Sequence, residues 1–285
     1  MDAAATLLRQ IFRSHRIPIG LTYALTCFEK ALQVLFPWAT GVAIDSLVRS
    51  DLSGVAVLCG LWFLHLVSAT FRQMYDTRLF TRIYGELATS TIIRQRAAGD
   101  AVSVIAARSS LSRECIDFVE RDVPMLFQTA LTGIGSLVMM FFYSTAVGLI
   151  GLALLVPAVL CNWWFARRAR RLNRAINNRL EREVGVIEAC GLPRVSRHFS
   201  MLRTFRVGLS DAEAINRSIV ELFMIAALAA ALVLYTAGGT HTPGAIYAVF
   251  VYVWTLFETI WVVPPAVNAI TRVQDIGTRV QPGNA

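Results

Sequence analysis

The chain has 285 residues, of which 55% are hydrophobic and only 16% are charged, and its mean hydropathy is +0.55. Soluble domains carry about 25% charged residues, so this composition excludes an ordinary soluble protein and predicts an integral membrane protein. The net charge is +8, but the charges lie in blocks between apolar runs. We therefore assign the excess to membrane topology, with membrane lipid as the partner, and expect no nucleic-acid partner.

The first sixteen residues have an amphipathic pattern. The apolar positions are Leu7, Leu8, Ile11 and Phe12, and the basic positions are Arg9, Arg13 and Arg16. This spacing predicts that residues 1–16 form a helix lying in the inner membrane interface, the alternative being an ordinary charged flank. The first apolar run has no small-residue cleavage site near its end, so we expect no signal peptide.

Six apolar runs are about long enough to cross a bilayer roughly 30 Å thick. They cover residues 17–38, 55–71, 123–143, 146–166, 219–238 and 245–264. Six helices of a soluble protein with such runs would have no polar surface left. The predicted fold class is therefore an all-α membrane protein with six transmembrane helices.

The arginines indicate how these helices are oriented. On one side of the predicted membrane, residues 1–16 contain 3 arginines, residues 72–122 contain 8, residues 167–218 contain 12 and the tail contains 2. The connections on the other side contain only Arg49. Cytoplasmic segments carry the excess of positive charge. We therefore expect both termini in the cytoplasm, in what we take to be the inner (plasma) membrane of a bacterium.

The two long arginine-rich segments, residues 72–122 and 167–218, are nearly equal in length and keep an apolar face at helical spacing. Each is predicted to form a long helix leaving the membrane, a short transverse helix and a long helix returning. About twenty residues in an arm correspond to about 30 Å at 1.5 Å per residue. The sequence thus predicts two helical hairpins that project far into the cytoplasm.

Local signals predict where these hairpins turn. Gly99 is a typical helix stop, and Asp100 is a favourable N-cap for "DAVSVIAAR". In the second hairpin, Pro193 begins "LPRVSRHFSML" and Gly208 is expected to end it. The sequence "SDAE" at 210–213 then has the pattern of a capping box for the helix into the fifth span.

This arrangement resembles the transmembrane domain of ABC exporters over nearly the whole chain, residues 17–285. "LFPWATGVAIDSL" is similar to the family's pattern of Pro37, Gly41 and Asp45 in the first span. "RLFTRIYGELATSTIIRQ" and "RECIDFVERDVPMLFQTAL" resemble the second helix and the start of the third. The glycine-rich turn before Pro243 and the helix that follows it resemble the fifth-to-sixth turn and the sixth helix.

The resemblance implies a homodimer that moves a solute by alternating access, driven by an ATPase that binds two cytoplasmic coupling helices. Their apolar contacts would be Val102, Ile105, Val195, Phe199 and Leu202. The sequence contains no G-x-x-x-x-G-K-[ST], and Lys30 is its only lysine. We therefore expect no enzymatic activity from this chain, no cofactor within it, and ATP only through a separate ATP-binding subunit. A transporter of this fold driven by protons and a scaffold that transports nothing are the alternatives.

Polar residues within the spans are the candidate pathway. Charged groups in a bilayer are costly unless they are paired or functional. The candidates are Glu29, Lys30, Gln33, His65, Gln128 and Glu258. Three roles stay open for the charged members: an ion pair between Lys30 and Glu258, the lining of a substrate cavity, and a proton carrier at Glu29 or Glu258. The four histidines share no ligand spacing, so we predict no metal centre.

Overall fold

The computed structural model describes residues 13, 15–97, 99, 102, 120–121, 123–188 and 191–279. Its helices are α2 (Arg16–Val34), α3 (Phe36–Val48), α4 (Ser53–Ala97), α6 (Val123–Tyr143), α7 (Thr145–Leu180), α8 (Glu183–Glu188), α9 (Leu192–Ala237) and α10 (Pro243–Arg279). Six helical segments in this part of the chain, α2 with α3 counting as one, are long and apolar enough to cross a membrane. The predicted fold class, an all-helical membrane protein with six spans, is confirmed.

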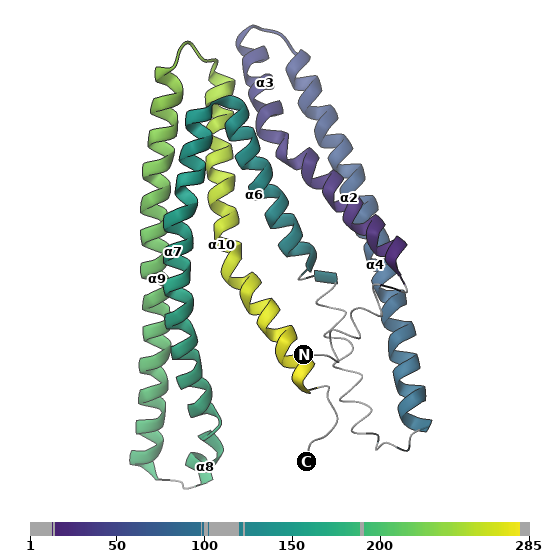
Figure 1. The fold of residues 1–285 in the computed structure, drawn as a ribbon, viewed down its shortest axis with the longest axis vertical. Helices are drawn as coiled ribbons and strands as arrows, with labels where there is room; N and C mark the ends of the chain where they lie inside the picture. Colours follow the sequence, from purple (N-terminus) through teal and green to yellow (C-terminus); the bar gives the residue numbers. More distant parts are fainter. Residues whose placement is uncertain are drawn as a thin grey trace.

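The helices diverge from one end of the molecule to the other (Figure 1). We call the end with the turns at 49–52, 144 and 238–242 the short-loop end, and the opposite end, where α4 ends and α8 lies, the extension end. α7 packs along α9, and α2 packs along α4. These two pairs are separated most at the extension end, with α6 and α10 between them.

The first span is broken at Leu35, between α2 and α3. Pro37 explains the break, because its nitrogen cannot donate to the carbonyl of Gln33 and its ring collides with that turn. At the break, the carbonyl of Val34 accepts a hydrogen bond at 2.8 Å from the hydroxyl of Tyr252, which is 1% exposed on α10. The span therefore runs from Arg16 to Val48, longer than the predicted 17–38, and its break is tied to the last helix.

α10 is the central helix of the bundle. The most apolar stretch of its span is 44% buried, against 11% for α6 and for α4. The main core cluster is centred on it and consists of Met140, Val147, Ala231, Tyr235, Ala248, Val249, Tyr252, Val253 and Leu256. Contacts with α3, α6, α7 and α9 surround α10, so a tilt of this helix would change its packing against all four.

The short-loop end is closed by a close approach of α3 and α10. A Cβ added to Gly244 would lie 1.9 Å from the carbonyl oxygen of Gly41, so only glycine fits there. Beside this contact the Asp45 carboxylate accepts hydrogen bonds from the Gly244 amide at 2.8 Å and the Thr242 hydroxyl at 2.6 Å. These contacts connect two helices about two hundred positions apart in the sequence.

The long helices agree with the prediction in part. α4 continues without a break from its span to Ala97, and Gly99 has the left-handed φ of +79° that terminates helices. The predicted end at Gly208 is wrong, because α9 is a single helix from Leu192 to Ala237. Consequently "LPRVSRHFSML" is the first part of α9 rather than a short transverse helix, and "SDAE" lies inside the helix instead of capping one.

Packing against α7 explains the continuity of α9. α7 and α9 pack along each other over their length, and Leu202 and Ala212, on either side of Gly208, are both buried. A glycine costs a helix only about 1 kcal/mol relative to alanine, which this packing offsets. The short piece at the end of the second hairpin is α8, which lies between α7 and α9. Most of the predicted interfacial helix of residues 1–16 lies outside the described residues, as does most of the first transverse helix, with Ile105.

Candidate functional site

A cavity of about 460 Å³ lies between α2, α3, α6 and α10. We call it the charged cavity, because Lys30 from α2 and Glu258 from α10 both line it. Its other polar lining residues are Gln33, Gln128, Thr129, Thr132, Ser136, Thr255 and Thr259. Its volume is within the range of about 300–1,000 Å³ that is typical of small-molecule sites. Four of the six predicted pathway residues thus lie around one space, and their role in transport stays a prediction.

Lys30 and Glu258 do not form the direct ion pair that was one of the three predicted roles. The Lys30 ammonium donates to the side-chain oxygen of Gln33 at 2.7 Å, and its nearest carboxylate oxygen belongs to Glu29 at 3.8 Å. The Glu258 carboxylate accepts a hydrogen bond from the Trp254 indole at 2.9 Å, one helical turn earlier on α10. Each charged group therefore has a neutral hydrogen-bond partner of its own, and the two are more than 4 Å apart.

Glu29 does not line this cavity. It is 5% exposed on the side of α2 that faces α4, where the Arg72 guanidinium donates a short hydrogen bond to it. Arg72 also donates to Asp76 at 2.8 Å. Burying a carboxylate is tolerable where a cation and hydrogen bonds compensate it. Glu29, Arg72 and Asp76 therefore form a structural link between α2 and α4, and the sequence prediction that placed Glu29 in the pathway is not supported by its position.

His65 also lies away from the cavity. It is on α4, and its ring contacts the edge of Phe36 with the ring centroids 4.9 Å apart. Phe36 in turn stacks on Trp62, whose ring centroid is 5.0 Å away. The histidine thus belongs to an aromatic group that packs α4 against the start of α3, next to the helix break, and it is not among the residues that line either cavity described here.

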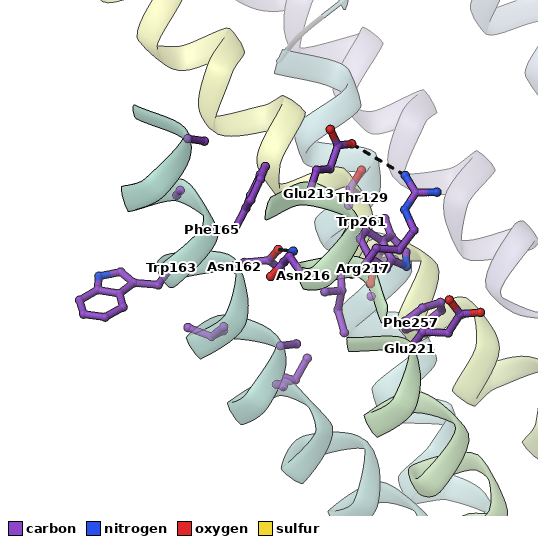
Figure 2. A pocket seen from close by; sticks show the side chains of 18 of the residues that line it. Thr129, Asn162, Trp163, Phe165, Glu213, Asn216, Arg217, Glu221, Phe257 and Trp261 are labelled. Carbon is purple, nitrogen blue, oxygen red and sulfur yellow. Dashed lines mark hydrogen bonds and ion pairs between the residues drawn. The ribbon is translucent and has the colours of Figure 1, made fainter. Parts of the chain in front are cut away.

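A larger cavity, of about 1,890 Å³, lies between α6, α7, α9 and α10 (Figure 2). Its walls nearer the short-loop end include Leu155, Leu256 and Phe257, whereas Arg170 and Arg174 line the part toward the extension end. At its centre the side-chain amide of the buried Asn216 donates to Asn162 at 3.1 Å, which joins α9 to α7. We call this the amphipathic cavity.

Aromatic and charged side chains surround the amphipathic cavity. Arg217 lies over the Trp261 ring at 5.2 Å and within 3.9 Å of Glu213, as Figure 2 shows. Trp163 points away from the other labelled side chains, and its ring carries the Arg167 guanidinium at 3.6 Å. A Trp with an Arg on its ring is typical of the membrane–water boundary, so this level of α7 marks where the helix leaves the apolar region.

The two cavities share a wall. Met125, Thr129 and Thr259 line both of them, so only side chains of α6 and α10 separate the two spaces. The Cβ of an alanine at Gly133 would be 3.1 Å from the Thr259 hydroxyl, which shows how closely α6 and α10 approach there. Small residues at this contact allow two helices to approach closely.

The predicted coupling contacts that the structure describes differ in their exposure. Leu202 is 5% exposed within α9, whereas Phe199 is 48% exposed and Val102 is 80% exposed. Val195 is half-buried in the first turn of α9. Among the described residues at the tip of the second hairpin, Val184, Ile187 and Leu192, on α8 and at the start of α9, are exposed apolar side chains. We call these three residues the hairpin tip.

Several residues that shape the site were not singled out from the sequence. Tyr252 and Arg72 donate hydrogen bonds to Val34 and Glu29, which are more than forty positions away in the sequence. No local sequence pattern indicates such a partner. Threonine is common in membrane helices, so the sequence alone did not mark the threonines of α6 and α10 as site residues. One signal was available for Arg72, because a cation at the end of an apolar run must be near either lipid headgroups or a buried carboxylate.

These features define a polytopic helical membrane protein with polar cavities between its spans, a closed short-loop end and a long helical hairpin at the other end. The profile of the ABC transporter transmembrane region family matches residues 8–244. Since the match covers most of the chain, the protein belongs to this family, and the predicted resemblance is confirmed. No curated protein matches the chain.

Proposed function

We propose that the chain is the membrane-spanning subunit of a transporter that moves a solute by alternating access and is driven by a separate ATPase subunit. The observation that carries this proposal is the combination of a closed short-loop end with a cavity of about 1,890 Å³ between helices that diverge at the extension end. Helices that pack closely at one end and diverge at the other fit one of the two states that alternating access requires, in which the pathway is closed on one side and open on the other.

The extension end would face the cytoplasm. The arginine excess of residues 72–122 and 167–218 supports this orientation. α9 has 46 residues, about 69 Å at 1.5 Å per residue, which is more than twice the roughly 30 Å of a bilayer. The hairpin of α7, α8 and α9 would therefore extend tens of ångströms into the cytoplasm, far enough to contact a soluble subunit.

The ATPase would bind the hairpin tip. Val184, Ile187 and Leu192 are 66%, 57% and 87% exposed, and apolar side chains exposed together on a solvent-facing end are typical of a protein contact. The central position of α10 would let a force on the cytoplasmic ends reach the closed short-loop end. In a homodimer, which the family resemblance implies, α6 with its largely exposed surface would be available to the second copy.

The test is co-purification of the full-length chain from native membranes in mild detergent, with ATP hydrolysis as the readout. We expect a stoichiometric ATP-hydrolysing partner, and Ile187→Asp is expected to release it. Val207→Asp is the matched control, because Val207 is 51% exposed on the same hairpin but away from its tip. A partner retained by both variants, or lost equally from both, would contradict docking at the tip.

A second candidate function is proton-driven transport by the same fold. Glu258 favours it, because this carboxylate lines the charged cavity with no cation within 4 Å among the described residues. In that case no ATPase would co-purify, and both a proton uncoupler and Glu258→Gln would abolish uptake into proteoliposomes. Absence of flux under ATP and under a proton gradient would leave the non-transporting scaffold.

A further inference from the structure

We propose that the charged cavity binds a small zwitterion, a solute with an ammonium group and a carboxylate on one short skeleton, such as a free amino acid or a short peptide. This inference rests on the proposed function, since it names the class of solute that the pathway would accept. Its basis is that one cation and one anion, Lys30 and Glu258, line the same cavity from different helices without contacting each other.

Lys30 would bind the carboxylate of the solute. An ammonium has three donors, and the one hydrogen bond that it makes here goes to Gln33 at 2.7 Å. The Glu29 oxygen at 3.8 Å is beyond hydrogen-bond distance, and Glu29 is itself held by Arg72. The Lys30 side chain is 15% exposed, and two of its donors have no hydrogen-bond partner among the described residues, so they can bind an anionic group in the cavity.

Glu258 would bind the ammonium of the solute. A carboxylate accepts about four hydrogen bonds, whereas the one hydrogen bond described for Glu258 comes from Trp254 to Oε1. An intramembrane carboxylate without a cation is costly, and a charge-assisted bond from a ligand ammonium would compensate it. Apart from Glu258, the neighbouring charges sum to zero, because the carboxylates of Glu29 and Asp76 balance the cations of Lys30 and Arg72.

The neutral lining fits the part of the solute between its two charges. Gln33, Gln128, Thr129 and Thr255 provide amide and hydroxyl groups on three helices, which suit an amide or hydroxyl on the ligand. The volume of about 460 Å³ corresponds to about fifteen water molecules at 30 Å³ each. A compact solute can therefore displace this water, and the proposal requires each of its ends to contact the group of opposite charge.

The test is equilibrium binding to the full chain in lipid nanodiscs at pH 7, with three forms of one dipeptide as probes. Free alanyl-alanine carries both charges, its methyl ester has only the ammonium, and its N-acetyl form has only the carboxylate. We expect the free dipeptide to bind about ten-fold or more tightly than either derivative, because each lost charge removes a charge-assisted bond. Free alanine, measured in parallel, distinguishes an amino-acid site from a peptide site.

Variants that remove one charge show which residue binds which end of the probe. With Lys30→Met the free dipeptide and its methyl ester should bind equally, and with Glu258→Gln the free dipeptide and its N-acetyl form should bind equally. The double variant Lys30→Glu, Glu258→Lys keeps one charge of each sign and should keep the preference for the zwitterion. Glu86→Gln, on the exposed part of α4, is the control that should change nothing.

The inference is overturned if none of the probes binds, if the three forms bind equally, or if both neutralising variants keep the full discrimination. A misfolded variant is recognised by size-exclusion chromatography, and Lys30→Arg then serves as the charge-conserving replacement. Failure of the proposed function looks different, since discrimination in binding without any ATPase partner or flux would contradict transport and leave the zwitterion site intact.

Discussion

The charged residues inside the spans differ in what compensates them. Glu29 has a guanidinium beside it and is closed off between α2 and α4, whereas Lys30, the next residue, faces a cavity. Adjacent residues on a helix point about 100° apart, so neighbours in the sequence can belong to different surfaces. The structure thus assigns Glu29 to the framework and Lys30 to the candidate site.

Replacement of Arg72 should destabilise the protein strongly. Arg72→Met would remove the cation that is hydrogen-bonded to both Glu29 and Asp76, leaving Glu29 only the Lys30 ammonium at 3.8 Å, and breaking a buried pair from one side costs about 3–5 kcal/mol. Arg82→Met is the comparison, because the ion pair of Arg82 with Glu86 is exposed and worth at most about 1 kcal/mol. Thermal unfolding in detergent measures both, and equal effects of the two variants would disprove the framework role.

Replacement of Gly244 should also be costly, for a steric reason. Gly244→Ala would place a methyl group 1.9 Å from the carbonyl oxygen of Gly41. Because that oxygen belongs to the backbone, the two helices would have to move apart, and such overpacking costs about 1–3 kcal/mol. Gly60→Ala is the control, since no atom of the described residues lies within 4 Å of its added Cβ. A Gly244→Ala protein as stable to heat as the Gly60→Ala protein would show that the short-loop end is not closed in this way.

Sequence reasoning could find the polar residues of the site but not their partners. The cost of a charge in lipid singles out Glu29, Lys30 and Glu258 without any structure. Which of them pair is decided by the register and rotation of α2 against α4 and α10, which depend on side-chain packing between helices. The Lys30–Glu258 pair was wrong for that reason, because Gln33 and Trp254 are closer to the two charged groups.

The helices themselves were largely predictable, since hydropathy and helical periodicity are local properties. The third span ends at Tyr143 in the sequence prediction and in the structure. The error lies at 208–213, where a glycine followed by Ser and Asp has the pattern of a helix end. Local signals of this kind are worth about 1 kcal/mol each, and the contact of α9 with α7 along its length is stronger.

The continuity of α9 leads to a prediction opposite in sign to that of the sequence pattern. Gly208→Ala should stabilise the protein by up to about 1 kcal/mol, because alanine favours a helix interior and the added Cβ would meet only Leu172 at 3.9 Å. Thermal unfolding of the variant gives the sign. A loss of stability would indicate that the chain turns at Gly208 after all.

At the scale of the molecule, the extension end and the short-loop end differ in arginine content and in shape. If the arginine-rich hairpins are cytoplasmic, a membrane-impermeant maleimide should label Ser50→Cys on intact cells but label Ile187→Cys only after the cells are opened. The native cysteines are first replaced by serine. Labelling of Ile187→Cys from outside would invert the topology and place the extension end outside the cell.

The thin wall between the cavities has a consequence for how their contents influence each other. Thr129 and Thr259 belong to both linings, so a molecule that pushes α6 or α10 aside from one space does so at the expense of the other. Occupancy on the two sides should therefore be antagonistic. A hydrophobic molecule bound beside Trp261 would then weaken the binding of a solute in the charged cavity without resembling that solute, and a higher solute concentration should overcome its effect.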